Sequence, residues 1–153
     1  AFHEELEASE ELLDQLQHEV WRIRTEYYQK LSAQYPARPL LTIQLGWCLV
    51  GTENWYEAIK IFEDLRQMKT LKNRDKLALL LGLAESQQAV RRFEDALQTY
   101  RQLQSALDCS KVERENLDAW MRDEIPGFHR QSFIERSLKR IKTLSNSMNS
   151  TPS

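Results

Sequence analysis

The sequence predicts an all-α fold, and three observations support this prediction. Only four Gly and four Pro occur in 153 residues, while Leu, Glu, Gln, Lys and Arg are abundant, as in helical proteins. Apolar residues recur at helical spacing along most of the chain. Two segments 38 residues apart are variants of one pattern, which is typical of stacked helical repeats. We therefore expect one helical domain over residues 1–144, followed by a disordered polar tail over residues 145–153.

The first predicted element is a long helix over residues 2–34. Its apolar residues form a stripe with the a/d spacing of a heptad, made of Leu6, Leu13, Leu16, Val20, Ile23 and Tyr27. Two interpretations of this stripe stay open: the helix packs on its own domain, or it pairs with another chain through residues 6–31. The acidic first turns suit a helix N-terminus, and the two prolines of "YPARP" end the helix.

Six further helices are expected along the rest of the chain. They are predicted over residues 40–50, 55–69, 74–90, 93–107, 110–124 and 132–144. "GTEN" separates the first two, a capping box from Ser110 to Glu113 opens the fifth, and "IPG" from Ile125 to Gly127 follows it. No linker interrupts this series, so the helices should share one core.

The repeated pattern lies in the four predicted helices between residues 40 and 107. When Ala58 is aligned with Ala96, the following pairs also correspond: Trp55 with Phe93, Phe62 with Tyr100, and Leu45-Gly46 with Leu83-Ala84. Small residues let two antiparallel helices approach closely, and the aromatic residues fill the space between neighbouring hairpins. Each copy is therefore interpreted as one helical hairpin.

These residues resemble the tetratricopeptide repeat (TPR) family, whose pattern places L-G in the first helix and A-x3-F in the second. The resemblance implies two degenerate repeats at about 39–72 and 77–110, with the N-terminal and C-terminal helices as caps. The period of 38 differs from the usual value of about 34, and no proline closes either repeat. An unrelated helical bundle is the alternative.

A second resemblance concerns the mitochondrial fission adaptor family, which has two TPR-like repeats and a C-terminal membrane anchor. The chain is similar to it in its leading helix, in "WCLV" (residues 47–50) and in the entry to the second repeat through "RD". No such anchor lies in this sequence. The resemblance implies an alternative function as a membrane-associated organelle adaptor.

Several functional classes are disfavoured by what the sequence lacks. It contains no GxSxG, P-loop, GxGxxG or HExxH motif, so we expect no enzyme, cofactor or metal site. A net charge of −2 argues against nucleic-acid binding. Cys48 and Cys109 form no CxxC motif, and no apolar run reaches the ~18 residues of a membrane span. These features predict a cytoplasmic protein in a reducing compartment.

Protein binding is the predicted function, as an adaptor or chaperone that takes a peptide or helix segment of another protein. The TPR resemblance implies a concave face lined by Ile43, Trp47, Val50, Leu81, Glu85 and Gln88. Because these six include no Lys, Arg or Asn, an amphipathic helix is a better ligand than a peptide carboxylate. Alternatively, one of the chain's own terminal helices fills this groove.

The last predicted helix is basic and amphipathic. Residues 130–142 contain five Lys or Arg and one Glu, whereas residues 1–20 contain seven Asp or Glu and no Lys or Arg. The helix is interpreted as a cap that closes the stack, with contact to a partner or to an anionic membrane as alternatives. A secondary contact would then involve Arg136, Lys139 and Arg140.

Overall fold

The computed structural model describes residues 2–107, 111–127 and 133–149. Within these ranges the chain forms seven α-helices and no strand, which confirms the all-α prediction. The helices are α1 Phe2–Gln34, α2 Pro39–Gly51, α3 Trp55–Arg66, α4 Asn73–Ala89, α5 Phe93–Ala106, α6 Lys111–Glu124 and α7 Phe133–Asn149. Cys109, Ser110 and His129 fall outside the described residues, and with them the first residue of the expected capping box.

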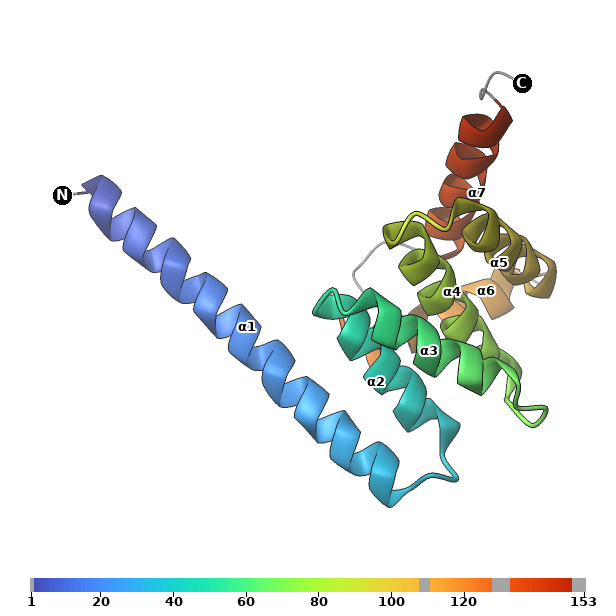
Figure 1. The fold of residues 1–153 in the computed structure, drawn as a ribbon, viewed down its shortest axis with the longest axis horizontal. Helices are drawn as coiled ribbons and strands as arrows, with labels where there is room; N and C mark the ends of the chain where they lie inside the picture. Colours follow the sequence, from blue (N-terminus) through green and yellow to red (C-terminus); the bar gives the residue numbers. More distant parts are fainter. Residues whose placement is uncertain (1, 108–110, 128–132, 150–153) are drawn as a thin grey trace.

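Helices α2 to α5 form two antiparallel hairpins that lie side by side, as Figure 1 shows. Helix α7 packs against α5 at one end of this stack, and α1 runs along α2 at the other end. The N-terminal half of α1 extends well beyond the rest of the molecule (Figure 1). Below, the helices α2 to α7 are called the body, and residues 3–20 of α1, all of which are exposed, are called the arm.

The two hairpins have the same turn geometry at an offset of 38 residues. Glu53 in the first turn and Arg91 in the second both adopt left-handed backbone conformations, with φ of 62° and 66°. The next backbone N–H in each turn donates to a carbonyl five residues back, at 2.8 Å from Asn54 to Leu49 and at 2.9 Å from Arg92 to Gln87. The repetition seen in the sequence is therefore a repetition of backbone structure.

The aromatic side chain of Phe62 fills the space between α2 and α4. It is fully buried, and a Cβ atom added to Gly46 or to Gly82 would lie 2.6 Å from its ring. Trp47 packs edge-on against Phe62, with ring centroids 6.5 Å apart, and its Nε1–H donates to the carbonyl of Ala78 at 3.1 Å. The structure thus places the predicted small residue Gly46 and the predicted aromatic residue in contact, and it adds Gly82 on the other side of the ring.

The C-terminal helix continues past its predicted end. We expected residues 145–153 to be disordered, but α7 continues to Asn149. The apolar spacing of Ile141, Leu144 and Met148 explains this difference, because Leu144 is buried and the other two pack partly against the core. The last four residues of the predicted tail lie outside the described residues.

Candidate helix-binding groove

The C-terminal half of α1 is attached to the body by one face. Trp21, Thr25 and Tyr28 lie on this face and are half-buried. The indole of Trp21 rests on bare backbone, since a Cβ atom on Gly51 would lie 2.4 Å from it and one on Gly127 would lie 2.5 Å from it. Gly127 also has a φ of +75°, which favours glycine. These contacts hold α1 against the end of α2 and the turn after α6.

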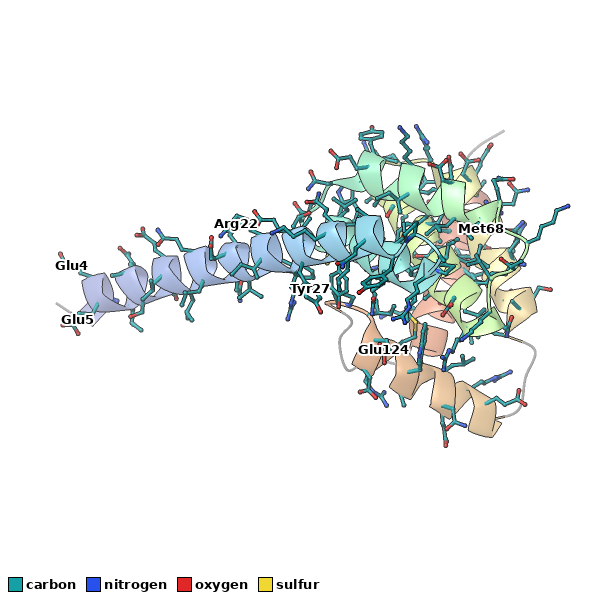
Figure 2. All side chains as sticks on the ribbon, turned by 90° about the horizontal axis from the view of Figure 1, so that it is seen from below. Glu4, Glu5, Arg22, Tyr27, Met68 and Glu124 are labelled. Atoms are coloured by element: carbon teal, nitrogen blue, oxygen red, sulfur yellow. The ribbon has the colours of Figure 1, made fainter. Side chains whose placement is uncertain are left out.

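The apolar stripe of α1 lies on a neighbouring face and is exposed. Its members from Leu6 to Tyr27 keep between 45% and 59% of their surface accessible. Figure 2 shows the N-terminal part of the helix projecting away from the body, with side chains on all sides in solvent. A row of exposed large apolar residues at heptad spacing is typical of a helix-binding surface.

A groove of about 590 Å³ lies between this stripe and the body. Leu13, Leu16 and Val20 of α1 form one wall, and Trp47 and Val50 of α2 form the other. Glu85 of α4 and the turn at residues 126–127 also line it. We call this feature the α1 groove. Its walls are largely apolar, with two charged side chains, Arg24 and Glu85, at its margins.

The residues predicted for the concave face are divided between the groove and the core. Val50 and Glu85 line the α1 groove, and Trp47 borders it with only 3% of its surface exposed. Ile43 and Leu81 are fully buried, so their side chains are not accessible to a partner in this structure. The reason is that α2 and α4 are the central helices, with almost every residue of 43–49 and 77–84 buried. A helix that is apolar on all sides offers few residues to a surface.

Two of the remaining predicted residues, Gln88 and Arg140, lie around a second hollow. Gln88 lies with Glu85, Trp55 and Arg140 around a smaller hollow of about 340 Å³. The predicted secondary contact residue Arg140 therefore adjoins the predicted face, while Lys139 is exposed on α7. The structure describes the backbone of Arg136 as helical but not its side chain.

Arg22 of α1 is paired with two glutamates of its own helix. The Arg22 guanidinium donates hydrogen bonds to Glu19 and, at 2.8 Å, to Glu26. The hydrogen bond from Arg22 lowers the pKa of the Glu19 carboxyl. Arg24 stacks over the ring of Trp21, 5.1 Å from its centroid, and so stands at the edge of the groove.

The thiol of Cys48 lies in the wall of α2 that faces α1. It is completely buried, and burial raises its pKa to about 12 from an ordinary value of 9.0. Since the reactive form of cysteine is the thiolate, Cys48 is a packing residue at neutral pH.

The α1 wall of the groove was not among the residues predicted for the concave face, although residues 6–31 were expected as an alternative surface for pairing with another chain. The sequence does carry its signal, because the a/d stripe is visible from Leu6 to Tyr27. What periodicity alone could not indicate is the direction in which the stripe faces, or that Gly51 and Gly127 would seat Trp21 and turn the stripe toward the groove.

Within the described ranges, no three His, Cys, Asp or Glu side chains are grouped so that they could hold a metal ion. In the same part of the chain, none of the helices combines the length and the hydropathy required to cross a bilayer. No family model, no curated protein and no solved structure matches this sequence.

Proposed function

We propose that this chain is a non-enzymatic protein–protein interaction adaptor whose α1 groove binds an amphipathic helix. The observation that supports the proposal best is the exposed stripe of Leu13, Leu16 and Val20 facing Trp47 and Val50 across the groove. A helix laid between these walls would bury apolar residues at positions i, i+3 or i+4, and i+7 on both sides.

The exposed side chains of the α1 wall supply part of the binding free energy that a helical ligand requires. Full burial of a Leu or Val side chain contributes about 1.5–3 kcal/mol, so covering three side chains that are about half exposed contributes roughly 3 kcal/mol. The ligand's own apolar face contributes a similar amount, and association entropy opposes both. Together the two faces contribute roughly 6 kcal/mol, which is less than the ~8 kcal/mol of a micromolar complex even before this entropy is subtracted, so a stable complex also requires contacts outside these three side chains.

The repeated hairpins support a TPR-like interpretation of the architecture. Both turns place a residue in the left-handed region at the same position and repeat the same hydrogen bonds. In such a stack the first helix of each hairpin supplies the binding face, and Trp47, Val50 and Glu85 lie on the first helices of the two hairpins.

The proposal is tested by comparing the proteins that immobilised variants retain from a cell extract. We expect Leu16→Glu and Val50→Glu, one from each wall, to lose the same set of bound proteins. Leu138→Glu is the matched control, because Leu138 is 43% exposed on α7 and lies outside the groove. Circular dichroism would confirm that each variant is folded. Equal retention by the unaltered chain and the three variants would contradict the proposal that the groove binds a helix of another protein.

A further inference from the structure

We propose that the helix bound in the α1 groove is α1 of a second copy of this chain, in antiparallel orientation, so that each copy places its arm beside the other's groove. This inference rests on the proposed function, because it names the occupant of the same groove. It follows from the order of apolar and charged residues along α1 and from the exposure of the arm.

The apolar residues of α1 are self-complementary in the antiparallel direction. In a coiled coil of this direction, each a position of one helix packs against a d position of the other. With Leu13 opposite Ile23 of the second copy, Leu16 falls opposite Val20 of the second copy, and the two-fold axis generates the same two pairs again. Four consecutive apolar layers result. The outer layers pair Leu6 with the aliphatic stem of Lys30, and Ser9 with Tyr27.

The charges of α1 distinguish the antiparallel from the parallel direction. Residues 1–20 contain seven Asp or Glu and no Lys or Arg, while Arg22, Arg24 and Lys30 follow them. Parallel helices would place two acidic arms together and Lys30 against Lys30. Antiparallel helices place Glu10 beside Arg24 of the second copy, and Lys30 near the acidic start of the second arm.

The opposite flank of the pair is acidic, and its charge is partly compensated within each helix. Glu19 of both copies would lie near the two-fold axis. Each Glu19 is hydrogen-bonded to Arg22 of its own helix, which also bonds Glu26. The repulsion between the two copies at this flank is therefore smaller than the charges of Glu19 and Glu26 alone would produce.

The body supplies additional apolar contacts, which a short coiled coil lacks. The four apolar layers cover only about two heptads, fewer than the three or four that normally mark a stable coiled coil. In the antiparallel register given above, residues 12–23 of the second α1 run beside residues 13–24 of the first, and these are the α1 residues that line the groove. There the second helix also lies beside the partly exposed Val50 of α2 across the groove. The exposed stripe and the groove wall are thus covered together.

The test is the molar mass of the whole chain in solution, measured by sedimentation equilibrium between about 1 μM and 1 mM. We expect a monomer–dimer equilibrium for the unaltered chain and for Leu138→Glu. Leu16→Glu should weaken the dimer by at least about a hundredfold, because the apolar layer is lost twice per dimer. Leu16 is 52% exposed, so this variant should keep the fold of the monomer.

A charge exchange tests the direction of the helices. Glu10→Arg and Arg24→Glu should each weaken the dimer about tenfold, and the chain with both substitutions should recover it. Recovery is expected only if residue 10 of one copy meets residue 24 of the other. A monomeric mass at all concentrations, or a double variant no stronger than the single ones, would overturn the inference.

The two proposals can fail separately. If the chain is monomeric but Leu16→Glu and Val50→Glu still lose bound proteins, the groove binds a helix of a different protein. If the mass is monomeric and the bound proteins are also unchanged, both proposals are wrong.

Discussion

The substitution Gly46→Ala tests whether α2 and α4 are held apart by the ring of Phe62. In an open helix, Gly→Ala stabilises by about 1 kcal/mol. At position 46 the new Cβ atom would lie 2.6 Å from Cε1 of Phe62, well inside a normal carbon–carbon contact. The ring has little room to move away, because Gly82 lies so close on its other side that a Cβ atom there would also be 2.6 Å from the ring. Overpacking of this kind costs about 1–3 kcal/mol, and more when no neighbour can shift.

We therefore expect Gly46→Ala to lower the free energy of unfolding by about 1–2 kcal/mol despite its better helix propensity. For a chain of this size, this corresponds to a melting temperature lower by about 2–8 °C. Urea unfolding followed by circular dichroism and by tryptophan fluorescence measures the change. Adding Phe62→Leu should recover part of the loss, because leucine lacks the ring atoms that meet the new methyl group.

The matched control is the same Gly-to-Ala difference at an open position. Gln98 is exposed on α5, so Gln98→Ala compared with Gln98→Gly measures the propensity contribution without a steric contact. The free energy of unfolding of Gln98→Ala minus that of Gln98→Gly gives the gain from helix propensity alone. If Gly46→Ala stabilises the chain by this same amount, the packing described around Phe62 is wrong.

Two further predictions concern backbone strain and a buried thiol. Arg91→Gly should stabilise the chain by about 0.5–1 kcal/mol in thermal unfolding, because Arg91 has a φ of 66°; Ala89→Gly, at the end of α4, should not stabilise it. Cys48 binds its proton more tightly in the folded chain, so the free energy of unfolding should fall as pH rises from about 9 toward 12, by at most about 1.4 kcal/mol per pH unit. In urea titrations at increasing pH, Cys48→Ala should show a smaller decline than the unaltered chain, and equal declines would contradict the assignment.

Much of this structure could be predicted from local sequence patterns. The helix Phe2–Gln34 ends, and the helix Trp55–Arg66 begins, where each was expected, because prolines and turn residues act on the backbone next to them. The correspondence of the two hairpins was also visible in the sequence. Each copy has a small residue, Ala58 or Ala96, where its two helices must approach closely. The sequence did not indicate that Gly82 closes the pocket of Phe62, because its neighbour lies 20 residues away along the chain.

The candidate site was predicted only in part. Trp47, Val50 and Glu85 were expected at a binding face and line the groove, whereas Ile43 and Leu81 are buried in the core. Their spacing on the helices is the same as that of exposed residues, so periodicity could not separate the two groups. The difference depends on how many helices surround α2 and α4.

The sequence by itself determined the all-α class, the duplicated hairpin and the heptad stripe of α1, because these follow from composition, from the similarity of two segments and from the spacing of residues along one helix. Only the tertiary structure decided which side of α1 is covered. Trp21 is seated on the bare backbone of Gly51 and Gly127, which come from distant parts of the chain. This contact attaches one face of α1 to the body and leaves the apolar stripe exposed beside Trp47, and so produces the groove. Periodicity reports which residues share a face, whereas the surrounding elements determine what that face meets.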